Sequence, residues 1–353
     1  MNENRKIHKG FKIFLLVFIA FILIIARLNK DDIIHTYSKN SKLEKVLNKE
    51  KEYNGKDLYY FNSEFIKWEN NLITFMSEDG SNKWIKEFDF IDPYILFGEE
   101  NIFVIDKSTG DIFGLNSNGE TTLRLQSGKP VFNIKESNKN IIIHYKENGV
   151  ESLEILNDKG KRLHILSTED KILTYSTWED GSNYIYSTIK VEDSNLSSKL
   201  YLDTFENKNK YSVEFPNEII IYTEFFSDGI LVITDLGIYY TESGEIKWSK
   251  DYQSIKDFKI LKNKIYMLCD KCMEVISMDG KSLSKVTYEE SYDKINILDK
   301  YIILYGSNDF LVILQEGKEV LKYNTEGIIK NITCDDSKMV ISYEDKLEVY
   351  SFK

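Results

Sequence analysis

The sequence has few prolines, cysteines and histidines for its length. Three prolines, three cysteines and four histidines occur among 353 residues. A structural zinc site needs four closely spaced Cys or His ligands, whereas the histidines stand apart at positions 7, 35, 144 and 164. Neither a phosphate-binding G-x-x-x-x-G-K-S/T motif nor a strand-linked G-x-G-x-x-G motif occurs. We therefore expect no metal site and no nucleotide site.

Negative charge exceeds positive charge over the chain as a whole. The chain has 46 Lys and Arg against 57 Asp and Glu, which gives a formal net charge of −11. A surface that binds nucleic acid needs clustered Lys and Arg to displace counterions from the phosphates. The only concentrated basic stretch is MNENRKIHKGFK at residues 1–12. We therefore expect no nucleic-acid partner.

One apolar run follows this basic stretch. Residues 13–26 carry no charge and are flanked by Lys12 and Arg27. At about 1.5 Å per residue, residues 11–28 extend roughly 27 Å as a helix, close to the thickness of a bilayer's hydrocarbon core. The preceding positive charges predict a cytoplasmic tail at residues 1–12, a single transmembrane helix at 13–28 and an exported remainder. A cleaved signal peptide is the alternative, but no small-residue cleavage site follows the run.

Residues 29–56 are rich in Lys, Asp, Glu and Asn. The stretch SKLEKVLNKEK at residues 41–51 is compatible with a helix but has only a thin apolar stripe. We interpret residues 29–56 as a stalk between the membrane and a domain at residues 57–353.

The composition of the rest favours β-strands. Aromatic residues make up 13% of the chain, with 23 Tyr and 20 Phe. Short apolar strands alternate with polar turns, and a glycine turn recurs about every 35 to 49 residues. Gly, Asn and Asp supply the positive φ angles that tight hairpins need. The turns are SEDG at Gly80, NSNG at Gly119, NDKG at Gly160, TESG at Gly244, SMDG at Gly280 and LQEG at Gly317, with ENKN near Asn209 in the one gap.

Large apolar residues follow these turns at a fixed offset. Trp84 and Trp248 lie four positions after the glycine in GSNKW and GEIKW, and Leu123 and Leu321 occupy the same offset elsewhere. Some strands are apolar at consecutive positions, which is typical of strands covered on both faces. Examples are Ile141-Ile142-Ile143, Ile219-Ile220-Ile221 and Ile302-Ile303-Leu304.

Repeated units of this size, each with four short strands, predict an all-β fold, namely a β-propeller over residues 57–353. Eight blades are favoured and seven are the alternative. Residues 328–352 supply three strands without a fourth, and we expect Leu58–Phe61 to complete that blade and close the ring. A β-helix or a two-sheet sandwich is less favoured, because a sandwich would not repeat its turn chemistry.

The arrangement at Gly80–Trp84 and Gly244–Trp248 resembles the repeat of PQQ-like, or quinoprotein-like, β-propellers. With its N-terminal anchor, the chain also looks like a family of membrane-anchored propeller proteins from clostridia and related bacteria. Quinoprotein dehydrogenases of this fold hold their cofactor with a disulfide between adjacent cysteines, a calcium site and a catalytic carboxylate. This sequence has no adjacent cysteines, so the resemblance implies the fold without the cofactor.

The most conspicuous local motif is Cys269-Asp270-Lys271-Cys272. Asp270 and Lys271 fit a two-residue hairpin turn with the cysteines facing each other. Plain strand residues are the favoured interpretation, and a disulfide or a reactive pair are the alternatives.

Other polar residues give no clear catalytic pattern. His144 and His164 lie in expected strands, without the Ser and Asp partners of a nucleophilic triad. The acidic pairs Glu99-Glu100, Glu289-Glu290 and Asp335-Asp336 lie in expected turns and lack EF-hand spacing. We therefore assign no catalytic, cofactor-binding or metal-binding residues.

These observations predict a non-enzymatic binding or scaffold propeller, anchored in the cell membrane and displayed outside it. Its expected partner is an envelope protein, a peptide or a glycan, because propellers commonly recognise partners through loops on a rigid ring. The alternative is a hydrolase or lyase of cell-surface polymers, with acidic residues from several blades around the channel. A quinone-dependent dehydrogenase is a third possibility.

Overall fold

The computed structural model describes residues 47–55, 57–77, 79–178, 182–192, 195–206, 209–335 and 338–352. The expected cytoplasmic tail and transmembrane helix lie outside these ranges. Within the ranges, no helix is long and apolar enough to cross a membrane.

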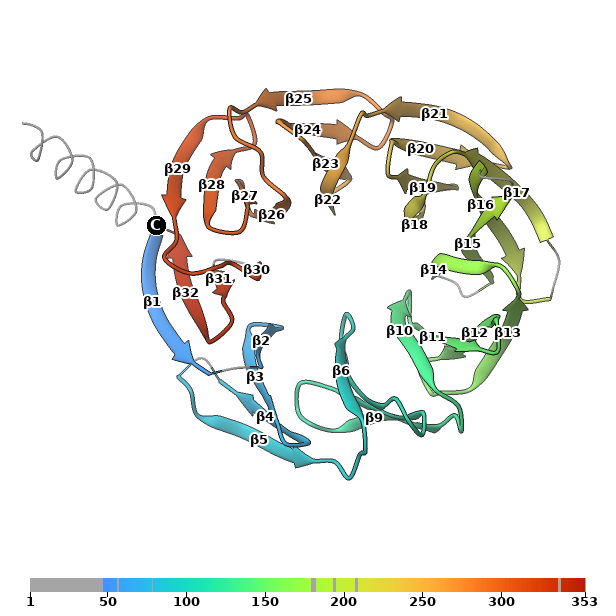
Figure 1. Ribbon diagram of the computed structural model, residues 1–353, viewed down its shortest axis with the longest axis horizontal. Coiled ribbons are helices and arrows are strands. Elements are labelled where there is room, and N and C mark those ends of the chain that lie inside the picture. The colour runs from blue at the N-terminus through green and yellow to red at the C-terminus, as the bar shows by residue number, and fades with distance from the viewer. Residues whose placement is uncertain are drawn as a thin grey trace, which may run out of the picture.

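In the described ranges, thirty-two strands form eight separate antiparallel sheets of four strands each, arranged in a ring around a common axis (Figure 1). The all-β propeller with eight blades is therefore confirmed, and seven blades are excluded. From the innermost strand outward, blades 1 to 4 consist of β2 (Leu58–Phe61), β3 (Glu64–Glu69), β4 (Leu72–Met76) and β5 (Asn82–Glu87); β6 (Pro93–Phe97), β7 (Ile102–Asp106), β8 (Asp111–Leu115) and β9 (Thr121–Gln126); β10 (Val131–Ser137), β11 (Asn140–Glu147), β12 (Val150–Asn157) and β13 (Arg162–Thr168); β14 (Lys171–Thr177), β15 (Asn183–Glu192), β16 (Asn195–Thr204) and β17 (Asn209–Pro216).

Blades 5 to 7 follow the same order, and blade 8 takes its outermost strand from the start of the described chain. They consist of β18 (Ile220–Phe226), β19 (Gly229–Thr234), β20 (Gly237–Glu242) and β21 (Glu245–Asp251); β22 (Ile255–Leu261), β23 (Lys264–Cys269), β24 (Cys272–Ser277) and β25 (Ser282–Thr287); β26 (Lys294–Leu298), β27 (Tyr301–Tyr305), β28 (Asp309–Leu314) and β29 (Glu319–Asn324); β30 (Asn331–Asp335), β31 (Lys338–Ser342), β32 (Lys346–Phe352) and β1 (Leu47–Asn54).

The antiparallel order gives the ring two different faces. One face carries the loops between the second and third strands of each blade and the connections from one blade to the next. We call this the upper face. The lower face carries the remaining turns. Because Leu47 pairs with Phe352 and Asn54 pairs with Lys346, β1 begins on the lower face and ends on the upper face.

The strand that closes the ring is β1, and the expectation that Leu58–Phe61 closes it is wrong. Leu58–Phe61 is β2, the innermost strand of blade 1, where it pairs with β3. The closing strand comes from residues 47–54, which the sequence analysis placed in the stalk and in a helix-compatible stretch. An outermost strand has one open edge and one largely solvated face, so LNKEKEYN can form a strand with few apolar residues.

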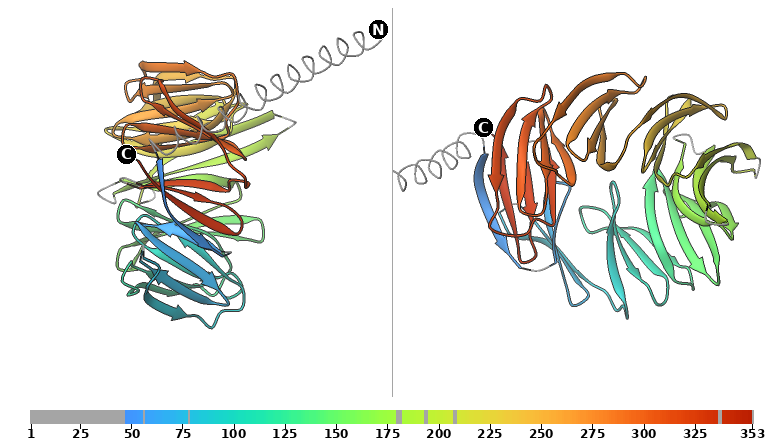
Figure 2. Two further views of the ribbon diagram at one scale, coloured as in Figure 1. Left: turned by 90° about the vertical axis from the view of Figure 1, so that its left-hand side faces the viewer. Right: turned by 45° about the horizontal axis from the view of Figure 1, so that its top comes forward.

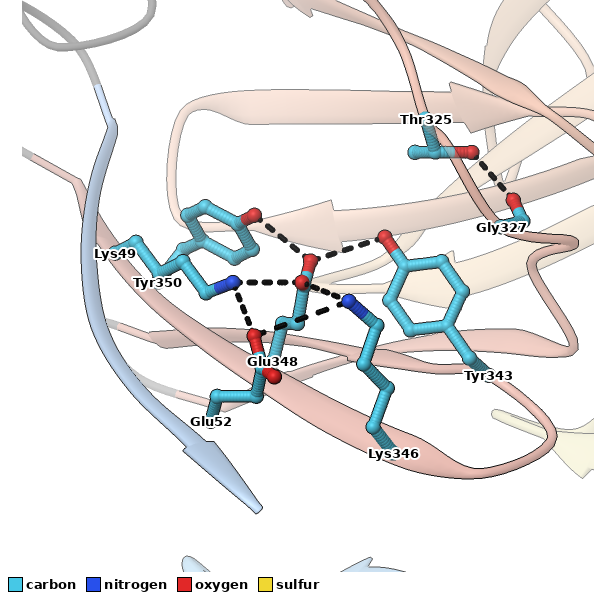
Figure 3. A network of polar contacts seen from close by, with 8 residues as sticks. All are labelled: Lys49, Glu52, Thr325, Gly327, Tyr343, Lys346, Glu348 and Tyr350. Carbon is cyan, nitrogen blue, oxygen red and sulfur yellow. Dashed lines mark hydrogen bonds and ion pairs between the residues drawn. The ribbon is translucent and has the colours of Figure 1, made fainter. Parts of the chain in front are cut away.

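A buried carboxylate joins β1 to its blade (Figure 3). Glu348 on β32 accepts hydrogen bonds from Lys49 of β1 and from Lys346, both at 2.7 Å, and from the hydroxyls of Tyr343 at 3.0 Å and Tyr350 at 2.9 Å. Its side chain is only 8% exposed. Burial alone would raise the pKa of Glu348, but the hydrogen bonds from Lys346, Lys49 and Tyr350 outweigh it and lower the pKa to about 2.

The blades pack face to face through strands that are apolar at consecutive positions. All five residues of β7 are buried, and so are Ile141–Ile143 and Ile302–Leu304, as the sequence predicts. Ile219–Ile221 departs from the expectation, because Ile221 on the innermost strand β18 is 42% exposed. Ile221 is the extra residue of a β-bulge between Ile220 and Tyr222 at the upper end of β18, so it is not paired with β19.

The recurring glycines and the large residues after them form one contact between successive blades. The indole of Trp84 in blade 1 donates to the carbonyl oxygen of Ser117 in blade 2 at 2.9 Å. A Cβ atom on Gly119 in that turn would lie 2.8 Å from the Trp84 ring, and Gly280 stands in the same relation to Trp248. The expected large apolar residue is therefore confirmed as the contact with the next blade's glycine turn.

Replacing Gly119 with Ala tests this contact. Gly119 has a φ of +77°, and Gly128 has a similar φ of +66° but no atom within 4 Å of an added Cβ. A positive φ costs each alanine about 1 kcal/mol, and only Gly119→Ala must also displace the Trp84 ring. We expect Gly119→Ala to lower the free energy of unfolding by about 1–3 kcal/mol more than Gly128→Ala, measured by urea denaturation. Equal losses would contradict the contact.

Candidate functional site

His144 lies inside blade 3 and holds that blade to the next. Its Nε2 is 3.0 Å from a carboxylate oxygen of Glu151, and the same oxygen accepts the backbone N–H of Ile172 at the start of blade 4. The imidazole is 2% exposed, and burial lowers the pKa of His144 although Glu151 opposes the shift. The geometry gives His144 a structural contact between blades.

His164 occupies the position that Trp holds in other blades, four residues after Gly160. It is buried, its ring packs on Phe205, and its Nε2 lies 3.0 Å from the Tyr184 hydroxyl in blade 4. Tyr184 also donates to Asp203 at 3.4 Å. Burial lowers the pKa of His164 and raises that of Asp203. His164 is thus the blade 3 version of the contact between blades.

The cysteine motif forms the expected hairpin, with β23 ending at Cys269 and β24 beginning at Cys272. Both residues are free thiols, Cys269 buried and Cys272 partly exposed. The third cysteine, Cys334, lies on β30 in blade 8.

The acidic pairs lie at three separate places. Glu99 and Glu100 form the β6–β7 turn on the lower face, Glu289 and Glu290 lie in the connection between blades 6 and 7, and Asp335 ends β30. Asp336 lies outside the described residues. Across the described ranges, no three His, Cys, Asp or Glu side chains are grouped so that they could hold a metal ion.

The sequence did not reveal a polar cluster on the innermost strands and an adjoining turn, near the axis of the ring. We call it the channel cluster. It consists of Glu99, Lys135, Glu136, Ser176 and Glu224, from blades 2, 3, 4 and 5. Lys135 donates to the Tyr175 carbonyl oxygen at 3.0 Å and lies 3.6 Å from Glu224. Ser176 also donates to Glu224. The cluster therefore connects the innermost strands β10, β14 and β18.

The β6–β7 turn places Glu99 where it interacts electrostatically with Glu136 and Glu224 of this cluster. Glu136 accepts hydrogen bonds from the backbone N–H of Glu100 at 2.9 Å and from the side chain of Asn101, which fixes the turn. Desolvation raises the pKa of Glu99, and repulsion from Glu136 and Glu224 adds to the shift. The cluster thus places a carboxyl that holds its proton to a higher pH than usual beside a carboxylate paired with Lys135.

Cavities open on both faces. One of about 430 Å³ lies between blades 2 and 3 on the lower face and includes Glu99 and Glu136. Another of about 330 Å³ lies where blades 8 and 1 meet and is lined by tyrosines and lysines, including Tyr59, Tyr60 and Lys346. The first has the size of a small-molecule pocket and adjoins the channel cluster.

The upper face carries most of the exposed apolar side chains outside the outermost strands. The three most exposed large apolar residues of the described chain are all here: Ile91 at 82%, Ile328 at 67% and Val191 at 66%. Ile91 and Ile328 lie in connections between blades, and Val191 lies near the tip of the long β15–β16 hairpin. Figure 2 (left) shows this hairpin extending beyond its neighbours on the side away from the C-terminus. Phe132, Val150, Ile221 and Leu236 add to the same face.

Acidic side chains surround these apolar residues. Ile91 lies between Asp89 and Asp92, and Ile328 follows Glu326 by two positions. The same face carries Glu169-Asp170, Glu289-Glu290 and Glu344-Asp345 in loops and connections. The upper face is therefore apolar and acidic, which suits a partner with basic residues around an apolar contact.

Solved structures with this fold are similar in shape and remote in sequence. BamB from Moraxella catarrhalis aligns with a TM-score of 0.58 and 11% identity, covering 87% of this chain and 100% of the BamB chain. Sqt1 from Saccharomyces cerevisiae aligns with a TM-score of 0.59 and 8% identity, covering 87% of this chain and 99% of its own. At such identities the similarity concerns the fold alone. None of the curated proteins matches the sequence.

The resemblance to PQQ-like propellers is supported at the level of fold, because BamB is a propeller of that kind. The resemblance to membrane-anchored proteins of clostridia stays a prediction. The model of the family of unknown function DUF5711 matches residues 33–352. This match spans the propeller, and the chain therefore belongs to that family.

Proposed function

We propose that this protein is a non-enzymatic binding or scaffold propeller, anchored in the cell membrane by residues 13–28, which holds a protein partner on its upper face outside the cell. The observation that carries the proposal is the gathering of the most exposed apolar residues, Ile91, Val191 and Ile328, on that one face. Single exposed apolar residues are ordinary, but several on one face of a rigid ring are typical of an interaction site.

The path of the chain supports this choice of face. Residues 1–46 lead into Leu47, and Leu47 lies beside Phe352 on the lower face. An anchor in residues 13–28 would therefore connect to the lower face. The upper face, at the far end of β1, would then be presented away from the attachment point. This placement rests on the charge pattern of residues 1–30 and on the register of β1.

The chemistry of the upper face favours a protein or peptide over a glycan or another envelope component. Its exposed apolar residues are mainly aliphatic, and acidic residues flank them. Aliphatic side chains bury well against a partner's apolar residues, and the acidic loops would attract basic residues at the rim. We expect binding to weaken as salt concentration rises.

Site-specific photo-crosslinking in cells tests the proposal. A crosslinking amino acid at position 91 or 328 should give one reproducible adduct of the same partner, and the same probe at position 85 should give none. Ile85 is also exposed, at 54%, but it lies on the outermost strand β5 and not on the upper face.

Substitutions with aspartate at the same positions provide a second test of the binding site. Ile91→Asp combined with Ile328→Asp should reduce capture of that partner at least tenfold, whereas Ile85→Asp should leave it unchanged. Equal capture from positions 85 and 91, or no loss in the double variant, would contradict an upper-face binding site.

A hydrolase or lyase of cell-surface polymers is a second candidate, and the channel cluster is the observation that favours it. A proton-holding carboxyl at Glu99 near the carboxylate of Glu224 is an arrangement that general acid catalysis could use. Release of polymer fragments by the intact protein but not by Glu99→Gln would favour this candidate over the binding function.

A further inference from the structure

The tip of the β23–β24 hairpin brings two thiols together on the upper face of blade 6. Leu268 pairs with Met273, so Cys269 and Cys272 are the next residues opposite each other, joined by the turn Asp270-Lys271. Two cysteines that face each other across a two-residue turn need little backbone movement to bond.

The two thiols differ in access. Cys269 is 8% exposed and packs in an apolar cluster with Ile233, Ile255 and Met267. Cys272 lies at the edge of the same cluster and is partly exposed. Burial raises the pKa of the Cys269 thiol. A reagent from solution therefore reaches Cys272 first, and Cys269 is placed to react second.

Contacts on either side hold the turn in position. The backbone N–H of Tyr288 donates to the Lys271 carbonyl oxygen at 3.0 Å, and the Ser291 hydroxyl donates to Asp270 at 3.0 Å. Among the described residues, the Tyr288 hydroxyl is buried without a hydrogen-bond partner. The connection between blades 6 and 7 thus holds the turn between the two thiols, and a change in the turn would alter these hydrogen bonds.

We propose that Cys269 and Cys272 form a reversible dithiol–disulfide couple, a modification site that a small-molecule disulfide oxidises. The Cys272 thiol loses its proton, and its thiolate attacks one sulfur of the small disulfide, so that one thiolate leaves and takes up a proton. Cys269 in turn loses its proton, its thiolate attacks the Cys272 sulfur of the mixed disulfide, and the second small thiolate leaves and takes up a proton. Two protein thiols are oxidised to one disulfide, and one small disulfide is reduced to two thiols.

A bond across a two-residue turn closes a short loop, so it restricts the unfolded chain little. We therefore expect the oxidised and reduced proteins to unfold at nearly the same temperature. This separates the couple from a structural disulfide, whose reduction would lower the unfolding temperature clearly. The change instead concerns the upper-face turn and its contacts with Ser291 and Tyr288.

Equilibration of the full chain with mixtures of reduced and oxidised glutathione tests the proposal. After acid quenching and alkylation, peptide mass spectrometry should show that Cys269 and Cys272 lose their reactivity toward the alkylating reagent together. The ratio of oxidised to reduced protein should follow the concentration of oxidised glutathione divided by the square of the concentration of reduced glutathione, as expected for one intramolecular disulfide. Cys334, which lies on another blade from both, should form only a mixed disulfide with glutathione and no bond within the chain. Cys334→Ser should show the same transition.

Single substitutions trap the two steps. Cys269→Ser should accumulate the glutathione adduct on Cys272, whereas Cys272→Ser should leave Cys269 largely unmodified because it is buried. If both cysteines of the unsubstituted chain remain alkylated under the most oxidising mixture, or if each takes up glutathione independently, the proposal fails. That result does not depend on either variant folding.

Discussion

A chain that lacks residues 1–54 is expected to lose its cooperative unfolding transition, whereas a chain that lacks only residues 1–46 should keep it. β1 pairs with β32 from Leu47 to Asn54, and Leu47 is buried in the core of blade 8. Removing the strand exposes the edge of β32 and opens the ring. We expect the loss to be comparable with the roughly 5–15 kcal/mol by which folded domains are stable. Thermal circular dichroism and size-exclusion chromatography provide the measurement.

The comparison between the two truncations is its own control. The shorter truncation removes the residues before β1 and leaves every pair between β1 and β32 in place. Equal unfolding temperatures for the two chains would mean that β1 contributes nothing to closure.

The second large effect is expected from Glu348→Gln. Glutamine keeps the shape of the side chain but removes the negative charge that Lys49 and Lys346 share, and it fits the hydroxyls of Tyr343 and Tyr350 less well. Breaking a buried ionic network from one side commonly costs about 3–5 kcal/mol. We expect a loss of this size at pH 7 in urea denaturation. Glu344→Gln, at an exposed position of the same blade, should change stability by less than about 0.5 kcal/mol.

The pH dependence of this effect has a definite direction. The pKa of Glu348 is lowered from 4.5 to about 2, so the folded state favours the ionised carboxylate. Its contribution, about 3 kcal/mol, is fully present above pH 4.5 and is lost as the pH falls toward 2. The unsubstituted protein and Glu348→Gln should therefore converge in stability near pH 2. A difference that is the same at pH 7 and at pH 2.5 would show that the charge of Glu348 does not stabilise the closure.

The sequence was sufficient to predict the propeller because its repeat resides in local chemistry. Each glycine turn needs a positive φ, and each turn receives the large residue of the preceding blade, as Gly119 receives Trp84. These requirements recur in six of the eight blades and produce a period that is visible in the sequence. His164 was harder to interpret, because a buried imidazole replaces the large apolar residue that marks the same position elsewhere.

The closing strand could not be predicted from local pattern. β1 packs chiefly through Leu47 and Tyr53 and is otherwise polar, so it resembles a solvated linker. Only its pairing with β32, which lies almost the whole chain length away, makes it a strand.

The channel cluster escaped prediction for a related reason. Glu99, Lys135 and Glu224 come from three blades, and each is an ordinary charged residue of its own strand or turn. The arrangement of blades 2 to 5 around the axis brings them within reach of one another. The spacing of these residues along the chain does not indicate such a site. The Cys269 and Cys272 pair is a local motif, and its hairpin could be predicted from the sequence.

Hydrogen–deuterium exchange over residues 47–54 in the full chain tests ring closure most directly. If β1 is the outermost strand of blade 8, the backbone N–H groups that pair with β32 should exchange as slowly as those of the other outermost strands, such as β5 and β21. Exchange of residues 47–54 at the rate of an unstructured peptide, while β32 stays protected, would contradict a ring closed by β1.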